Sequence, residues 1–232
     1  MKKSLIALAV AAALVPSLAM AEAGDIVVRL RATNITADES SDLGQKTNAA
    51  YGAGVANALY GSNTADLKVD SNTIPELDIS YYFTKNIAAE LILALGSKHD
   101  VSISPGSAGV KNLGEVNLLP PTLTLQWHFN PDQMIDPYVG AGVTYVRAMD
   151  NGLDYNGLPI RIDRNNWGAA LQAGVDVNLE NRWLVNFDVK KIFVDTDVKL
   201  DTQGVVGTAG YKKIDNLDID PWVISVGFGK KF

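Results

Sequence analysis

The sequence predicts an all-β fold, an eight-stranded antiparallel transmembrane β-barrel with short periplasmic turns and longer extracellular loops. Three observations predict it: an export signal, a period-two pattern in eight segments, and tryptophans near strand ends. The closing segment shows the pattern well, since alternate residues are apolar except for one lysine: Trp222, Ile224, Val226, Phe228, Lys230 and Phe232. A strand with two unlike faces separates two environments. About ten such residues cross a bilayer as a tilted strand.

Residues 1–21 have the pattern of a secretory signal peptide. Two lysines precede an apolar core at residues 5–15, and alanines at positions 19 and 21 supply the small residues of a cleavage site. A membrane anchor helix is the alternative, but the apolar run is too short to span a bilayer. We therefore expect cleavage after Ala21 and one barrel domain over residues 22–232.

Composition narrows the class of protein. Removing the signal lowers the formal net charge from −6 to −8, because that segment holds two lysines and no acid. Without an excess of basic residues, the sequence predicts no nucleic-acid partner. The chain has no cysteine, so packing and backbone hydrogen bonds must hold the fold. No apolar run beyond the signal is long enough for a membrane helix.

The first three predicted strands are residues 26–33, 75–83 and 87–95. The first alternates apolar residues with Arg29 and Arg31. The second and third are joined by a tight turn, which is typical of a hairpin. Their apolar faces carry tyrosine, phenylalanine and leucine, while acidic residues occupy the opposite faces.

The other five predicted strands are residues 122–129, 138–146, 166–177, 183–194 and 221–232. Short connections follow the second, fourth and sixth strands, and longer connections follow the first, third, fifth and seventh. This rhythm is typical of a barrel with brief periplasmic turns and longer outer loops. An even number of strands lets an antiparallel ring close. The long connections are expected to be loops, although residues 67–70 alternate again.

The aromatic residues favour a membrane barrel over a soluble β-sandwich, which would also alternate. All four tryptophans lie on the apolar parity near strand ends, and the apolar faces carry no charge through the middle of any strand. In membrane barrels, aromatic residues near strand ends form girdles at the boundary between lipid tails and headgroups. The predicted girdle residues are Phe83, Trp127, Phe129, Trp167, Trp183, Trp222 and Phe232.

Five stretches of the chain together resemble the OmpW family of small outer-membrane barrels. They are residues 25–34 (DIVVRLRATN), 75–95 (PELDISYYFTKNIAAELILAL), 119–129 (LPPTLTLQWHF), 137–146 (PYVGAGVTYV) and 226–232. The outer loops resemble the family poorly. The resemblance implies an eight-stranded barrel whose lumen admits small hydrophobic molecules and releases them sideways into the membrane.

The residues that alternation turns into the lumen are charged in the lower and middle parts of the barrel. The predicted lumen charge network consists of Arg29, Arg31, Glu76, Asp78, Glu90, Asp176, Asp188 and Lys190. These groups should pair, because an unpaired buried charge is costly. A barrel of this size has an interior just filled by side chains, so a structural plug is the plain interpretation.

Nearer the outer end, the inward residues become apolar. We expect an apolar vestibule of Ile92, Ala94, Ile192 and Val223 above the charged floor, with apolar loop residues such as Leu43, Tyr60 and Leu153 above it. The alternative is that these residues simply pack the barrel top. Pro75, Pro120, Pro121 and Pro221 stand at predicted outer strand ends, where they either open the wall sideways or merely end strands.

Catalysis and metal binding have little support in the sequence. Only His99 and His128 are present, and neither has a nucleophile and an acid visibly set beside it. The acidic loops contain no twelve-residue calcium loop. The sequence therefore predicts no enzyme, no cofactor and no metal.

The predicted function is passive passage of small hydrophobic molecules through the outer membrane. The alternative is a structural or adhesive surface barrel without a transport role. Expected partners are outer-membrane lipid and lipopolysaccharide, a small hydrophobic solute, and the barrel-assembly machinery through the strand ending in Phe232.

Overall fold

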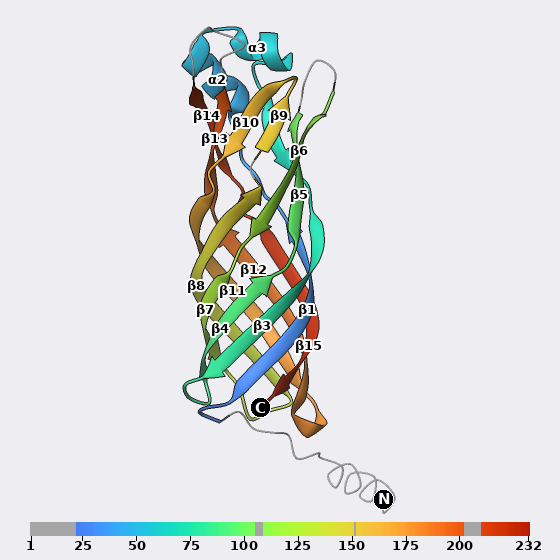
Figure 1. Ribbon diagram of the computed structural model, residues 1–232. Coiled ribbons are helices and arrows are strands. Elements are labelled where there is room, and N and C mark those ends of the chain that lie inside the picture. The colour runs from blue at the N-terminus through green and yellow to red at the C-terminus, as the bar shows by residue number, and fades with distance from the viewer. Residues whose placement is uncertain (1–21, 105–108, 151, 202–209) are drawn as a thin grey trace, which may run out of the picture.

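The computed structural model describes residues 22–104, 109–150, 152–201 and 210–232 (Figure 1). Within them, eight antiparallel strands close into a barrel in the order β1-β3-β4-β7-β8-β11-β12-β15, and β15 pairs with β1. The predicted fold class is confirmed. The strands are β1 (Ile26–Thr36), β3 (Asn72–Tyr82), β4 (Ile87–Ala94), β7 (Thr122–His128), β8 (Ile135–Asp150), β11 (Asn165–Asn178), β12 (Trp183–Phe193) and β15 (Trp222–Lys231).

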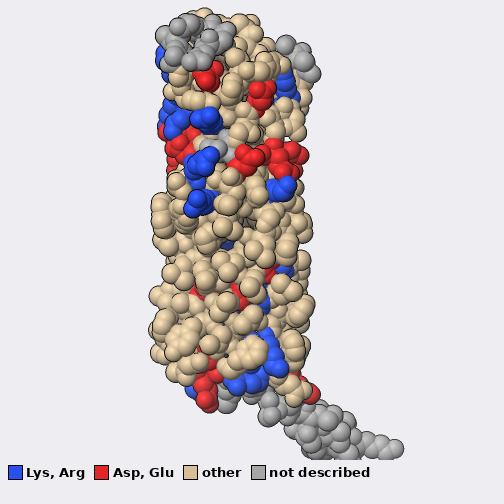
Figure 2. Space-filling model, viewed as in Figure 1, with Lys and Arg blue, Asp and Glu red and all other residues tan. Residues whose placement is uncertain are grey.

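Alternation along each strand sorts its side chains between the lumen and the outside. On β1, Leu30 is 49% exposed on the outer face, while its neighbour Arg31 is 2% exposed inside the ring. Leu30 pairs with Phe228 on one side and Leu77 on the other, so apolar residues line up across strands. On the face drawn in Figure 2, the middle of the barrel is a mostly uncharged band, with only small patches of charged atoms visible between the others.

The short connections and the C-terminal end of the chain lie at the same end of the barrel (Figure 1). The connections are residues 83–86, 129–134 and 179–182. In the last of these, Asn181 and Arg182 adopt positive φ in a 3-10 turn, η1 (Glu180–Arg182), which brings the chain back between β11 and β12. The opposite end carries the long connections.

The long connections form an ordered extension rather than loops. β2 (Asp66–Val69), β5 (Ser97–Ser104) and β6 (Lys111–Leu119) continue the barrel sheet, with β6 paired to the upper part of β8. A second sheet contains β9 (Gly152–Tyr155), β10 (Leu158–Ile162), β13 (Asp195–Asp201) and β14 (Tyr211–Asp218). Two helices, α2 (Leu43–Tyr51) and α3 (Val55–Tyr60), lie at the outer tip (Figure 1).

The expectation of loops was wrong because the extension has the opposite amphipathicity. Its core is apolar and its surface is polar, the pattern of a sheet that faces water on one side. Leu43, Tyr60, Ile160, Leu200 and Ile214 are all 2% exposed or less within this core. Among the residues that the structure describes, no helix has the length and apolarity needed to span a bilayer.

Candidate functional site

Two arginines of β1 organise the lower lumen. Arg29 Nη1 lies 3.1 Å from Glu90 Oε1, and its Nη2 lies 2.5 Å from Asp176 Oδ2. Arg31 Nη2 lies 3.0 Å from the same Glu90 oxygen, and its Nη1 lies 2.9 Å from Asp78 Oδ2. Glu90 therefore bridges the two guanidinium groups. Neither carboxylate oxygen of Asp78 has a well-oriented hydrogen bond, so its contact with Arg31 is electrostatic.

Lys190 of β12 joins the remaining acids to this cluster. Its Nζ lies 2.8 Å from Asp188 Oδ1 and 3.2 Å from Glu76 Oε1, and Glu76 Oε1 is also 3.3 Å from Arg31 Nη1. The structure thus places all eight predicted charged residues in one connected network, each 2% exposed or less. Three basic groups face five acids, so neutral hydrogen-bond donors are needed to satisfy the surplus.

Those donors are amides and a phenol that the sequence interpretation did not include. Gln172 Nε2 donates to Glu90 and to Asp188, at 2.7 Å in both cases. Gln126 Nε2 donates to Glu90 at 2.8 Å, and the hydroxyl of Tyr138 donates to Asp188 at 2.6 Å. All three lie on the inward parity of predicted strands, which is the signal that could have found them.

Small residues make room for these long side chains. A Cβ on Gly174 would lie 2.4 Å from the ring of Tyr138, and one on Gly140 would lie 3.0 Å from Gln172 Oε1. Because both contacts are with groups fixed in the network, neither glycine can be enlarged without displacing it. The lower lumen is therefore filled by side chains, as expected of an eight-stranded barrel.

The lumen is also closed beneath the network. His128 Nδ1 lies 2.8 Å from Asp136 Oδ2, and His128 packs between the rings of Tyr82 and Tyr138. Val27 and Leu184 pack with Tyr82 at this end and are 1% exposed or less. Asp136 lies just outside the predicted strand, which began at residue 138, so the sequence interpretation missed this pair.

An apolar cavity lies above the network, where the barrel meets the extension. It contains about 960 Å³ of space free of atoms, counted with the solvent at its mouth. The lining includes Ile35, Leu118, Val146 and Ile219. Side chains of both the barrel and the extension therefore form its wall.

The predicted vestibule residues divide into two pairs. Ile192 and Val223 line the cavity, whereas Ile92 and Ala94 do not. Ile92 pairs with Asp78 in the sheet, and Ala94 pairs with Glu76, which places both beside the charged network. The sequence interpretation placed them too high because strands in a closed barrel are tilted and staggered. Two residues of different strands that are equally far from a turn in the sequence therefore lie at different heights in the barrel.

The core of the extension lies between this cavity and the outer tip. Tyr60 stacks edge-on against Tyr155 with ring centroids 5.3 Å apart, and the hydroxyl of Tyr155 donates to the carbonyl of Leu59 at 2.5 Å. Leu43 and Leu153 are buried here, and Leu153 also lines the cavity. The apolar loop residues named from the sequence therefore form a roof.

The wall of the barrel is interrupted beside the cavity. The ladder between β4 and β7 ends at Ile92 paired with Thr122, and pairing resumes between β5 and β6 at Ser97 and Leu118. Residues 93–96 and 119–121 face each other across this stretch without ladder pairing. We call it the Pro120 interruption. Pro120 lines the cavity, and proline has no N–H to donate to a ladder.

Two other prolines of the proposed exit stand in a closed wall. Pro75 lies inside β3 rather than at its end, pairs with Ala32, and accepts a hydrogen bond from Leu95 N at 3.2 Å. The carbonyl of Pro221 accepts from Ile192 N at 3.1 Å. Pro121 is joined to β8, since its carbonyl accepts from Tyr145 N at 2.9 Å, so only the side of Pro120 and Pro121 that faces residues 93–96 is without ladder pairing.

A serine–histidine pair also lines the cavity. His99 Nδ1 lies 3.0 Å from the carbonyl oxygen of Asp70, so we assign the ring proton to Nδ1. Nε2 then accepts the hydroxyl hydrogen of Ser97 at 2.9 Å. The carboxylate of Asp70 is 3.8 Å from Nδ1 and instead accepts from Asp100 N. The serine is thus set beside His99, which sequence distance alone did not show.

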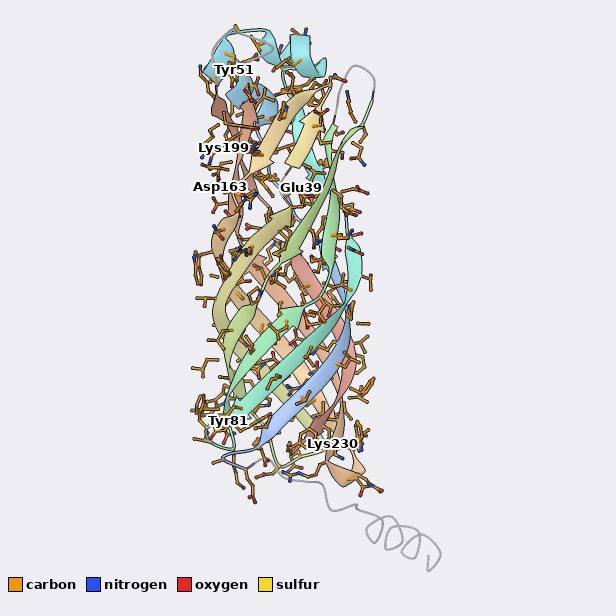
Figure 3. All side chains as sticks on the ribbon, in the orientation of Figure 1. Glu39, Tyr51, Tyr81, Asp163, Lys199 and Lys230 are labelled. Atoms are coloured by element: carbon orange, nitrogen blue, oxygen red, sulfur yellow. The ribbon has the colours of Figure 1, made fainter. Side chains whose placement is uncertain are left out.

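The predicted girdle residues all point away from the lumen. Their exposed fractions range from 43% for Trp183 to 69% for Trp167. Lys230 Nζ lies 5.2 Å from the ring centroid of Trp183, near the short-turn end where Figure 3 labels Lys230 and Tyr81. Lys191 Nζ lies 5.0 Å from the ring of Trp222 at the other end. In the part of the chain that the structure describes, no three His, Asp or Glu side chains gather as metal ligands.

Comparison with known proteins agrees with this architecture. The model of the OmpW family matches residues 22–232. The uncharacterized outer-membrane protein y4mB of Sinorhizobium fredii is 44% identical over 72% of this chain and 69% of its own length. Outer membrane protein W of Vibrio cholerae is 31% identical over the full length of both chains. The dibenzothiophene metabolism operon protein PahQ of Pseudomonas aeruginosa is 29% identical over 52% of this chain and 53% of its own.

A solved structure shares the fold. The crystal structure of the outer membrane protein OprG from Pseudomonas aeruginosa aligns with a TM-score of 0.76 at 28% identity. The alignment covers 92% of this chain and 98% of OprG.

Proposed function

Because this chain belongs to the OmpW family of outer-membrane proteins, we propose that it gives small hydrophobic molecules passive passage and releases them sideways into the membrane. The observation that carries the proposal is the apolar cavity directly above a filled ionic floor. A solute that reaches the cavity leaves water, which is favourable by about 0.8 kcal/mol for each buried methylene. The name of the relative PahQ links that protein to dibenzothiophene, a molecule of this chemical class.

The ionic floor supports a sideways rather than a downward route. To pass through the lumen, an apolar solute would have to displace charged groups that hydrogen-bond to one another. Breaking such a buried pair costs about 3–5 kcal/mol. The Pro120 interruption offers a route without that cost, because the ladder hydrogen bonds of a paired wall are missing there. Leu118 and Pro120 line the cavity at the edge of this stretch, so the interruption adjoins the cavity directly.

A structural or adhesive surface barrel is the second candidate. The observation that favours it is closure at both ends, since the network fills the lumen and the roof covers the cavity. On this account the cavity is only imperfect packing at a junction. None of the relatives reported above has the name of an enzyme, and we propose that the barrel performs no covalent chemistry.

Uptake of an apolar fluorescent dye by proteoliposomes tests the proposal. Ile192→Asp combined with Val223→Asp puts two carboxylates into the cavity wall and should lower uptake at least about tenfold, since each charge must be desolvated when solute enters. Val110→Asp is the matched control, because Val110 is 70% exposed on the surface. Gel migration with and without heating checks that each variant folds. Uptake unchanged in the double variant would favour the structural candidate.

We also propose that the barrel-assembly machinery recognises β15 through its terminal aromatic residue. Phe232 is 61% exposed and its backbone pairs with Ile26 at the closing seam. Phe232→Ala should reduce the amount of folded protein in the outer membrane while leaving the stability of the refolded barrel nearly unchanged. Equal amounts of folded protein for the variant and the native sequence would contradict this role.

A further inference from the structure

Nearly all basic side chains that the structure describes have a partner. Those of the surface are held by a carboxylate, as Lys199 is by Asp163, or lie over an aromatic ring, as Arg161 lies 4.2 Å from the ring centroid of Tyr211. Within residues 22–104, 109–150, 152–201 and 210–232, two basic side chains make no ion pair, hydrogen bond or cation–π contact. They are Arg147 and Arg164, and both are exposed.

The two unpartnered arginines are neighbours. Arg147 pairs in register with Asn165, and Ala148 N donates to the carbonyl of Arg164 at 2.9 Å. The acid next to Arg164 in the chain, Asp163, is already paired with Lys199, and Oδ1 of Asp150, the nearest acid along the chain to Arg147, accepts from Gly152 N. Figure 3 shows Asp163 and Lys199 close together in the extension, above the membrane-crossing part. Two arginines at adjoining positions where β8 meets the start of β11 therefore have no neutralising carboxylate.

The height of Arg147 and Arg164 on the barrel follows from the outer girdle, by which we mean the aromatic residues Trp167 and Trp222 at the outer end of the membrane-crossing strands. Tyr145 pairs with Trp167, and their rings are 4.8 Å apart on the outward face. Arg147 follows Tyr145 on the same face, about 7 Å further along the strand at the usual rise per residue. The hydroxyl of Tyr145 donates to Asn165 Oδ1 at 2.5 Å, which fixes this ring beside Asn165, the register partner of Arg147. In Figure 2 the charged side chains begin above the uncharged band.

We propose that Arg147 and Arg164 bind a phosphate of a phosphorylated glycolipid of the outer leaflet, with Trp167 and Tyr145 against its sugar and acyl chains. A guanidinium group presents paired N–H donors that match phosphate oxygens. Two of them at one site match the charge of one phosphate group. Aromatic side chains at this depth are suited to the boundary between acyl chains and headgroup. Cations near a bilayer surface are attracted to anionic headgroups in the same way.

Binding of diphosphorylated lipid A to the full chain in detergent micelles tests the site. Arg147→Gln combined with Arg164→Gln should weaken binding about tenfold or more, because charge-assisted hydrogen bonds are lost. Arg182→Gln is the matched control, since Arg182 is exposed at the opposite end of the barrel. Both changes are on the surface, and heat-dependent gel migration confirms folding.

Two further arms identify the source of the phosphate. Lipid A from which the phosphates have been removed should bind the native chain as weakly as the double variant binds the intact lipid. Millimolar inorganic phosphate should not displace the lipid from the native chain. Equal binding of intact lipid A by the double variant and the native chain would overturn the proposal. Displacement by inorganic phosphate would overturn the assignment to a lipid.

Discussion

The lower lumen and the cavity share several barrel strands, yet their interiors have opposite character. β12 shows the change within one strand, since its inward residues Asn186, Asp188 and Lys190 belong to the polar network, while Ile192 lines the cavity. Below the outer girdle, the barrel is polar inside and apolar outside. Above it, the extension is apolar inside and polar outside. The surroundings of each half, lipid or water, therefore set which side of a strand is apolar, and a cavity forms where the two patterns meet.

The largest effect should come from breaking the network at its centre. Glu90→Ala leaves Arg29 and Arg31 without their shared carboxylate and should destabilise the barrel by about 3–5 kcal/mol. Urea unfolding in lipid vesicles, followed by tryptophan fluorescence, measures it. Glu115→Ala is the control, because its pair with Lys98 is exposed and should contribute little. A loss below about 1 kcal/mol for Glu90→Ala would show that the network contributes little to stability.

The extension should respond to loss of packing instead of loss of charge pairing. Ile160→Ala removes a side chain that is 1% exposed on β10 and should cost about 2–4 kcal/mol. Hydrogen exchange should become faster in β10 and β13 but remain slow in the barrel strands, because packing there is unchanged. Arg161→Ala, an exposed neighbour, serves as the control. Faster exchange throughout the barrel strands would show that the two regions unfold together.

The roof should weaken at high pH. Burial raises the pKa of Tyr60 to about 12. Unfolding exposes the phenol, which then loses its proton near pH 10, so the unfolded state binds fewer protons between pH 10 and 12 and stability falls as pH rises. The loss should be about 1 kcal/mol at pH 11. Tyr60→Phe should remove this component of the pH dependence measured by hydrogen exchange; an identical dependence in the variant would contradict it.

Filling the cavity should have the smallest effect on stability of these variants but a large effect on dye uptake. Val223→Phe fills part of the cavity with an apolar ring and should change stability by less than about 1.5 kcal/mol. Dye uptake should nevertheless fall, because the space for solute is occupied. Stability measured in urea and uptake measured in proteoliposomes separate the two effects. Undiminished uptake with a filled cavity would place the solute route elsewhere.

The period-two pattern was enough to predict the barrel strands, and each observed strand overlaps its predicted segment, although β8 begins three residues before and ends four residues after the predicted 138–146. The alternation also identified the charged residues that point into the lumen, because successive residues of a strand face opposite sides of the sheet. It could not predict which of them meet, because Arg29 and Asp176 are 147 residues apart and only ring closure and stagger join them. The same stagger explains the misplaced height of Ile92. Apart from residues 67–70, the extension was not predicted, because a strand in the lipid turns its apolar face outward whereas β5 and β13 turn polar faces to water.

The proposed route is tested most directly by closing the Pro120 interruption. Ala94→Cys combined with Pro120→Cys is designed to form a disulfide across it, while Ile92→Cys combined with Thr122→Cys is designed to form one two residue pairs lower, in the paired wall. Dye uptake by proteoliposomes is then compared before and after reduction. We predict that oxidation stops uptake through the first variant, that reductant restores it, and that the second variant is unaffected. Undiminished uptake through the oxidised Ala94→Cys, Pro120→Cys protein would contradict lateral release.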